Sequence, residues 1–247
     1  MQGAGLILTS YVQSLERVMD ITANNVANMT TTGFKKHGIA FDTYIMRPAR
    51  QNEFQFAVEH GTYRDTQQGP TVMTGNPLDV SIQGDGYFPV QTPQGTRYTR
   101  AGTFLLNGEG AMVTPEGYQV LGEGEQAIEI PEDARDISIA SDGTVSAAIG
   151  PEGTVQELGR LQLMGFAGEQ AMMHVGGNLY MANEVPAPVE NGRMVQGGIE
   201  QSNVQGVVEM TRMMEVTRTY QTCVHLLELE NERQRTAIGR LGSTTAA

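Results

Sequence analysis

Glycine and proline are confined mostly to the middle of this chain, and this segregation decides where long helices can form. All ten prolines lie between Pro48 and Pro188, and 25 of the 30 glycines fall between residues 37 and 206. Both residues interrupt helices, and both are common in tight turns. The sequence therefore predicts two helical ends around a turn-rich middle.

Each end carries residues at alternating spacings of three and four, which is typical of a helix that buries one stripe. The N-terminal stripe consists of Leu8, Tyr11, Leu15, Val18, Thr22, Asn25 and Met29. The C-terminal stripe consists of Met210, Met213, Thr217, Tyr220, Val224, Leu227, Asn231, Gln234, Ile238 and Leu241. We expect the first helix to end near Gly33, because glycine accepts the left-handed conformation that stops a helix. Each stripe must be buried on the other helix or on neighbouring molecules, since exposed apolar surface is unfavourable, and self-assembly is the simplest solution.

The middle of the chain has the shorter rhythm of β-strands. The expected strands are Val80–Ile82, Tyr87–Val90, Tyr98–Arg100, Ile137–Ile139, Leu161–Leu163 and Leu179–Met181. Gly-Asp-Gly, Asp-Gly and Pro-Glu-Gly sequences punctuate them and favour hairpin turns. The predicted fold class is α+β. It comprises a terminal helical domain (1–36 and 205–247), an extended connecting segment (37–74) and a mostly antiparallel β-rich outer domain (75–204).

Charge and cysteine content exclude several classes of protein. The net charge is -12, and residues 37–206 hold 21 acidic and 8 basic side chains, so we expect no nucleic-acid partner. No apolar run approaches the roughly 18 residues that span a bilayer, so no direct membrane insertion is expected. Arg17 follows Leu6–Leu8, which is not the order of a cleavable secretory signal. One cysteine, Cys223, excludes an internal disulfide and predicts a small buried apolar side chain.

No residue pattern points to catalysis, a cofactor or a metal. His37, His60, His174 and His225 lack the spacing of a metal-binding motif. Asp79, Asp85 and Asp142 allow a second hypothesis, a secreted β-rich carbohydrate-active enzyme or adhesin with paired carboxylates. Each lies in a turn-rich setting where an aspartate caps the local backbone, and we favour that interpretation. Two stripe-bearing ends also have no use in such an enzyme.

Several motifs resemble those of the flagellar rod and hook protein family, and together they span nearly the whole chain. Residues 23–35, Ala-Asn-Asn-Val-Ala-Asn-Met-Thr-Thr-Thr-Gly-Phe-Lys, are similar to its N-terminal signature. Segments 75–88, 98–104 and 117–121 look like its central landmarks in the same order, and Ser202-Asn203-Val204 looks like its C-terminal landmark. Residues 62–70, running into Gly75-Asn-Pro, look most like the proximal-rod branch of the family. The distal-rod branch is the alternative.

The resemblance implies a structural axial protein without catalytic activity. It implies export in an unfolded state by the flagellar type III apparatus, followed by helical assembly with other rod proteins and neighbouring basal-body components. The assembly surrounds the export channel in the periplasm. In this family the terminal helices pair as an inner coiled coil and the β domain lies outside. The charged patch Glu228, Glu230, Glu232, Arg233 and Arg235 departs from the family pattern.

The candidate functional residues are therefore those that contact neighbouring subunits or the export apparatus. The first group is the two stripes, together with Asn24, Asn25 and Asn28, which either bond between helices of adjacent subunits or form a solvated face. Met210, Met213 and Met214 provide either an adaptable contact surface or ordinary core packing. Phe41 and Ile45 match a short export-gate element with both side chains on one face, or else pack in the core.

Overall fold

The computed structural model describes residues 2–46, 54–189 and 192–244. For residues 2–4, 6, 41–46, 54–60 and 238–244 it describes the backbone alone. The chain forms two compact units: unit 1 contains residues 1–27, 37–65 and 205–247, and unit 2 contains residues 28–36 and 66–204. The α+β class is confirmed, with two long helices and a mostly antiparallel β domain.

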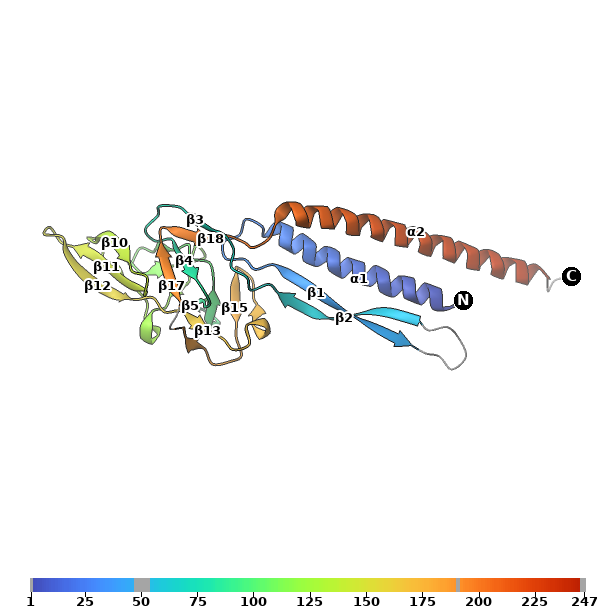
Figure 1. The fold of residues 1–247 in the computed structure, drawn as a ribbon, viewed down its shortest axis with the longest axis horizontal. Coiled ribbons are helices and arrows are strands. Elements are labelled where there is room, and N and C mark those ends of the chain that lie inside the picture. The colour runs from blue at the N-terminus through green and yellow to red at the C-terminus, as the bar shows by residue number, and fades with distance from the viewer. Residues whose placement is uncertain (1, 47–53, 190–191, 245–247) are drawn as a thin grey trace. The chain divides into compact units, whose positions relative to one another are not determined.

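Unit 1 contains two antiparallel helices and one hairpin. The helices are α1 (Gln2–Ala27) and α2 (Gly206–Thr244), which lie side by side (Figure 1). With 39 residues at 1.5 Å each, α2 is about 58 Å long. Strands β1 (His37–Met46) and β2 (Phe54–Arg64) pair in antiparallel register, with His37 opposite Arg64. Much of the segment expected to be extended and connecting is therefore a hairpin within unit 1.

The prediction that the first helix ends near Gly33 is wrong, because α1 ends at Ala27. Residues 28–36 belong to unit 2, where the backbone N–H of Thr31 donates to the carbonyl of Asn28 at 3.1 Å. The Thr31 hydroxyl also donates to the Asn28 side chain at 3.2 Å. Local bonds of this kind compete with helical ones, and tertiary contacts of residues 28–36 then decide the outcome.

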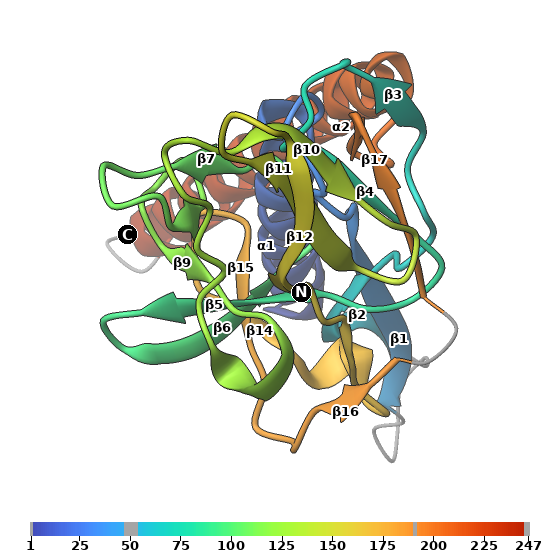
Figure 2. The same ribbon diagram turned by 90° about the vertical axis from the view of Figure 1, so that its left-hand side faces the viewer.

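The strands of unit 2 are short and pair antiparallel. A seven-stranded sheet has the order β14-β15-β6-β5-β9-β8-β7, and Figure 2 shows β6, β5 and β9 together within it. Its strands are β5 (Phe88–Thr92), β6 (Gly95–Thr99), β7 (Leu105–Leu106), β8 (Met112–Val113), β9 (Gln119–Val120), β14 (Met173–His174) and β15 (Leu179–Met181). A three-stranded sheet consists of β10 (Arg135–Ile139), β11 (Thr144–Ile149) and β12 (Thr154–Arg160). Three further pairs join β13 (Met164–Gly165) to β16 (Ala187–Pro188), β17 (Arg193–Gln196) to β4 (Val80–Gln83), and β18 (Gly198–Glu200) to β3 (Thr71–Met73).

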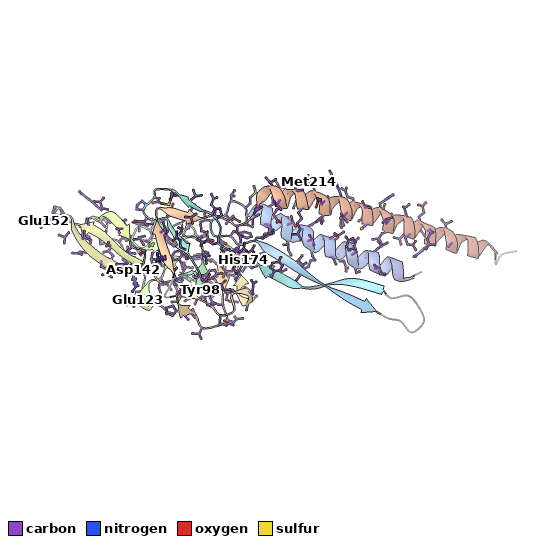
Figure 3. The ribbon with its side chains drawn as sticks, viewed as in Figure 1. Tyr98, Glu123, Asp142, Glu152, His174 and Met214 are labelled. Carbon is purple, nitrogen blue, oxygen red and sulfur yellow. The ribbon has the colours of Figure 1, made fainter. Side chains whose placement is uncertain are left out.

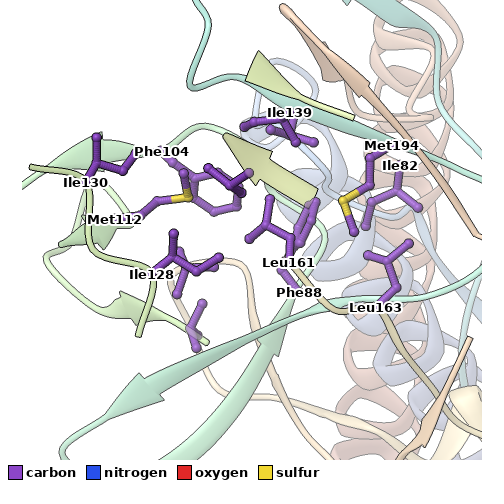
Figure 4. Close-up of a cluster of buried hydrophobic side chains, with 14 of the residues drawn as sticks. Ile82, Phe88, Phe104, Met112, Ile128, Ile130, Ile139, Leu161, Leu163 and Met194 are labelled. Carbon is purple, nitrogen blue, oxygen red and sulfur yellow. The ribbon is translucent and has the colours of Figure 1, made fainter. Parts of the chain in front are cut away.

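The hydrophobic core of unit 2 gathers side chains from most of these strands. Figure 4 shows Phe88, Phe104, Met112, Leu161 and Met194 within it. The rings of Phe88 and Phe104 meet edge to face with their centroids 5.2 Å apart. Segment 161–163, predicted as a strand, lies outside the named strands, although Leu161 and Leu163 are buried in this core. The apolar alternation there reflects burial, with a single antiparallel bridge between Leu161 and Gly122 in place of a continuous strand.

Gly102 permits the close backbone approach that seals one side of this core. The backbone N–H of Val80 donates to the carbonyl of Gly102 at 2.8 Å. A Cβ atom at residue 102 would stand 1.7 Å from the carbonyl oxygen of Val80, which is far inside contact distance. Only glycine fits this position without moving the backbone.

We expect Gly102→Ala to lower the free energy of unfolding of the β domain by about 1–3 kcal/mol, because the added methyl group overpacks a closed contact. Urea unfolding followed by circular dichroism measures the change. Gly108→Ala is the matched control, since a Cβ at residue 108 meets no atom within 4 Å. Equal effects of the two substitutions would contradict the packing explanation.

Candidate assembly interface

The helices of unit 1 pack along one apolar seam. Val12 and Leu15 of α1 meet Cys223 of α2, all three buried, with Val216 and Tyr220 alongside. The Tyr220 hydroxyl donates to Glu16 Oε1 at 3.1 Å, and the Thr217 hydroxyl lies 3.8 Å from Met19 Sδ. The seam is therefore closed within a single chain.

Most of the predicted stripe residues that the structure describes are buried or half-buried, and the exceptions include Tyr11 and Met210. In α1, Leu15 and Val18 are buried as expected and Leu8 is half-buried, but Tyr11 is 41% exposed and Val12 takes its place. In α2, Met213, Thr217, Tyr220, Val224 and Leu227 are half-buried, whereas Met210 is 42% exposed.

The predicted stripe of α2 omitted Glu209, Val216 and Cys223, which are spaced seven residues apart. Val216 and Cys223 pack in the seam with Tyr220 and Leu227, and the burial expected of Cys223 is confirmed. The burial of Glu209 was not predicted because charged residues usually lie at the surface, yet its side chain is only 1% exposed. The side chains of Ile238 and Leu241 lie outside the described residues.

A second apolar column of α2 faces away from the seam. Val207, Met210 and Met214 follow one another at spacings of three and four, with exposed fractions of 81%, 42% and 55%. Figure 3 shows Met214 on the side of α2 away from α1. Leu226 and Leu229, 45% and 48% exposed, form a smaller apolar pair further along α2. We call Val207, Met210 and Met214 the outer column.

The three candidate asparagines have different positions. Asn25 is 1% exposed, and its side chain accepts from the backbone N–H of His37 at 2.9 Å and donates to the His37 carbonyl at 2.8 Å. Its amide also donates to Glu209 Oε2 at 3.4 Å. Asn25 thus joins α1, β1 and α2 of its own chain. Asn24 is exposed on α1, while Asn28 and Met29 are half-buried beyond its end.

We expect Asn25→Ala to lower the free energy of unfolding by about 1–3 kcal/mol, because it leaves buried polar groups of His37 without their side-chain partner. Thermal unfolding of the purified chain measures the loss. Gln13→Ala, also on α1 and exposed, is the control, and we expect it to change stability by less than about 0.5 kcal/mol. An Asn25→Ala variant of unchanged stability would show that the bonds of the Asn25 side chain to the His37 backbone contribute little.

The motifs that carry the family resemblance converge on a buried ion cluster in unit 2. Lys35 Nζ lies 2.7 Å from Glu200 Oε1, and Arg100 Nε lies 2.8 Å from Glu200 Oε2. The side chains of Lys35, Arg100 and Glu200 are 1%, 4% and 1% exposed. The N-terminal signature contributes Lys35, a central landmark contributes Arg100, and Glu200 precedes the C-terminal landmark. We call these three residues the ion cluster.

Backbone groups complete the ion cluster. Arg100 donates to the carbonyls of Gly84 at 2.5 Å and Gly86 at 3.1 Å, and its guanidinium lies 5.9 Å from the centre of the Tyr87 ring. Gly33 has a φ of +70°, and a Cβ there would stand 2.6 Å from the Arg100 carbonyl carbon. Gly33 therefore has a packing role, because it lets the N-terminal signature approach the backbone of Arg100 closely.

Burial and the neighbouring Arg100 guanidinium lower the pKa of Lys35 below its usual value of 10.5, although Glu200 opposes this shift. Between the lowered folded pKa and 10.5 the unfolded chain binds more protons than the folded chain. The free energy of unfolding contributed by this group therefore rises with pH in that window.

We expect Lys35→Met to remove this alkaline rise in stability. Urea unfolding of both chains at a series of pH values up to 10.5 measures it, as a difference between wild type and variant that widens as the pH increases. A difference that stays constant with pH would show that Lys35 holds its proton equally in both states.

The carboxylates that suggested an enzyme are held by their own turns. Asp79 accepts from the Thr74 hydroxyl at 2.6 Å and from the Asn76 amide at 3.0 Å. Asp142 accepts from the backbone and hydroxyl of Thr144, both at 3.1 Å, and these bonds lower the pKa of its carboxyl. Asp85 is exposed. Asp79 and Asp142 thus have the capping roles expected of aspartate in turns.

The remaining predicted residues have varied positions. His37 is half-buried, His174 and His225 are exposed, and the side chain of His60 lies outside the described residues. Within the described ranges no group of three or more metal-ligating side chains comes together. Phe41 and Ile45 lie in strand β1 rather than in a helix, and their side chains are outside the described set. In the part of the chain described, neither helix has a stretch long and apolar enough to cross a bilayer.

The charged patch near the end of α2 is organised by one exposed ion pair. Arg233 donates to both carboxylate oxygens of Glu230, at 2.7 Å and 2.8 Å, and Gln234 donates to Glu230 at 3.1 Å. These bonds, with that from Arg233 the largest cause, lower the pKa of Glu230 to about 2. An exposed pair one turn apart adds little to stability.

Comparison with known proteins gives matches at both ends and in the middle of the chain. Residues 13–35 match a flagella basal body rod protein family, and residues 81–147 match the D1 domain of flagellar hook protein FlgE/F/G. Residues 195–240 match the C-terminal region of flagellar basal body rod FlgEFG proteins. These ranges contain Lys35, Arg100 and Glu200 of the ion cluster, as well as the outer column.

Full-length relatives support the same family. The flagellar basal-body rod protein FlgF of Caulobacter vibrioides is 36% identical, over 98% of this chain and 99% of its own length. FlgF of Mesorhizobium japonicum is 32% identical over the same shares, and FlgG of Bacillus subtilis is 33% identical over 90% of this chain and 93% of its own length.

The chain has two long helices and a β domain, and its signature residues Lys35, Arg100 and Glu200 have structural roles in a buried ion cluster. The chain belongs to the flagellar basal-body rod protein family, and it is a structural subunit of the basal-body rod. The FlgF type is better supported than the FlgG type, because the FlgF relatives match nearly end to end. The resemblance to the proximal-rod branch is confirmed in this sense.

Proposed function

We propose that this rod subunit assembles helically with copies of itself and with other rod proteins around the export channel. In this proposal α1 and α2 pair as a coiled coil, and the outer column of α2 contacts a neighbouring subunit. The observation that carries the proposal is an exposed apolar column beside a seam that is already closed. The proximal rod is the position that the FlgF-type relatives favour, with the distal rod as the alternative.

The outer column is suited to contact rather than to packing within the chain. Its three side chains are 42–81% exposed, while Val12, Leu15 and Cys223 of the seam are 7–9% exposed. Contiguous apolar residues with a polar rim mark interaction surfaces in soluble proteins. Arg212 and Glu215 lie on the same turns of α2, are exposed, and stand outside the column.

Methionine makes the outer column adaptable. A flexible thioether side chain packs well against irregular partners, and subunits within a short rod meet neighbours that are not identical. Tyr11 on α1 and Met210 on α2 are predicted stripe residues whose exposure suits them to contact a neighbouring subunit. Asn25 is not among them, because its bonds lie within its own chain.

The family resemblance also supports export by the flagellar type III apparatus. Phe41 and Ile45 remain candidates for recognition by that apparatus, as part of an unfolded segment that later forms β1. We infer no catalytic role. This inference rests on Asp79 and Asp142, whose carboxylates are engaged by neighbouring hydroxyl, amide and backbone groups.

We expect Met210→Gln/Met214→Gln to reduce incorporation of the subunit into basal bodies by at least tenfold without changing the stability of the purified chain. Glutamine keeps the length and helix propensity of methionine but removes apolar contact area. Quantitative immunoblotting of isolated basal bodies measures incorporation, and urea unfolding measures stability.

Arg212→Gln/Glu215→Gln, on the same turns of α2 but outside the column, is the matched control and should incorporate normally. Normal incorporation of the methionine double variant would rule out the outer column as a subunit contact.

A further inference from the structure

The ion cluster is assembled from three stretches of chain that are far apart in sequence. Lys35 lies in the segment 28–36 that follows α1, Arg100 follows β6 in the β domain, and Glu200 ends β18, shortly before α2. Glu200 bridges the other two, with one carboxylate oxygen on each cation. Its Oε1 also accepts from the backbone N–H of Gly69 at 3.0 Å.

The charges of the ion cluster do not balance. Two cations share one carboxylate, so the buried group carries a net positive charge. A buried charge is tolerated only with a partner, and leaving one without its partner is strongly destabilising. With Glu200 absent, Lys35 and Arg100 would be two like charges in a site where their side chains are 1% and 4% exposed.

Backbone and side-chain hydrogen bonds also join residues 28–36 to residues 198–204. The backbone N–H of Gly33 donates to the carbonyl of Glu200 at 2.7 Å, and the N–H of Lys36 donates to Asn203 Oδ1 at 2.7 Å. Lys35 Nζ and the Asn203 amide both donate to the carbonyl of Gln67, at 2.7 Å and 3.0 Å. Segment 28–36 therefore rests on groups that residues 198–204 supply.

We propose that Glu200 acts as a lock that makes the docking of residues 28–36 conditional on the docking of residues 198–204. Until β18 is in place, Lys35 cannot enter its site beside Arg100 without an uncompensated charge. The segment that follows α1 and the segment that precedes α2 are then fixed in one cooperative step. This conclusion is independent of the proposed contact between subunits.

The test is a double-mutant cycle in the full-length chain, with Lys35→Met, Glu200→Gln and the double variant. Lys35→Met alone leaves the balanced pair of Arg100 and Glu200, so the urea midpoint should fall slightly. Glu200→Gln leaves two buried cations, and amide hydrogen exchange at residues 31–36 should accelerate roughly 100-fold or more. Strands β4, β5 and β6 should keep most of their protection.

The decisive outcome is that the effect of Lys35→Met on the urea midpoint changes sign between the wild-type and the Glu200→Gln backgrounds. Adding Lys35→Met to the Glu200→Gln chain removes one of two unpaired cations, so it should raise the urea midpoint and restore part of the protection of residues 31–36. If Glu200→Gln does not fold alone, recovery of folding in the double variant supports the lock equally. A Lys35→Met substitution that lowers stability in both backgrounds would overturn it, as would unchanged exchange at residues 31–36 in Glu200→Gln.

The control cycle uses the exposed pair of Arg160 and Asp142, 3.8 Å apart and 48% and 55% exposed. Arg160→Met and Asp142→Asn should have small effects of the same sign in either background, because solvent screens exposed charges. A sign reversal in this control would show that the reversal is not specific to burial, and the lock would be rejected.

Discussion

The fold of unit 2 depends on neutralising charge in its interior with a single carboxylate. Glu200 receives Lys35 from one end of the chain and Arg100 from the middle, and the three are almost completely buried. Ionic groups are costly to bury, and a hydrophobic replacement is often as stable, so such a cluster contributes more to specificity than to stability. Gly33 and Gly69 also donate backbone N–H bonds to Glu200, so the cluster joins several segments of the chain.

The helical unit follows a different principle. Its seam is apolar, and the polar groups within it are satisfied locally: Asn25 clamps the backbone of His37, and Tyr220 donates to Glu16. Apolar seams are adaptable, since side chains of similar volume replace one another at small cost. The chain thus combines a β domain specified by buried charge with helices that pack through apolar contact and expose a second apolar column.

The sequence predicted the architecture because the underlying signals are periodic. Confinement of proline and glycine predicted two long helices, and alternation predicted β4, β5, β6, β10 and β15 close to their observed bounds. It did not predict the end of α1 at Ala27, since contacts made by residues 28–36 in unit 2 outweigh local propensity.

The burial of Val12 and Glu209 was not predicted, for a similar reason. Tyr11 and Val12 fit a heptad almost equally well, and Glu209 looked solvated. The ion cluster had no periodic signal at all: Lys35, Arg100 and Glu200 stood within or beside the family motifs, but only three-dimensional proximity gives them a common role. A charged residue can be buried only with a partner, and here the partners are distant in the chain, so the sequence alone does not indicate the burial.

The outer column also has a redox consequence. Met210 and Met214 present their thioethers to solvent, where oxidants convert methionine into the polar sulfoxide. A free subunit would lose apolar character at the surface that faces its neighbour, whereas a subunit already covered there would be shielded. Oxidative damage would thus fall mainly on material awaiting incorporation, and the finished rod would be comparatively durable.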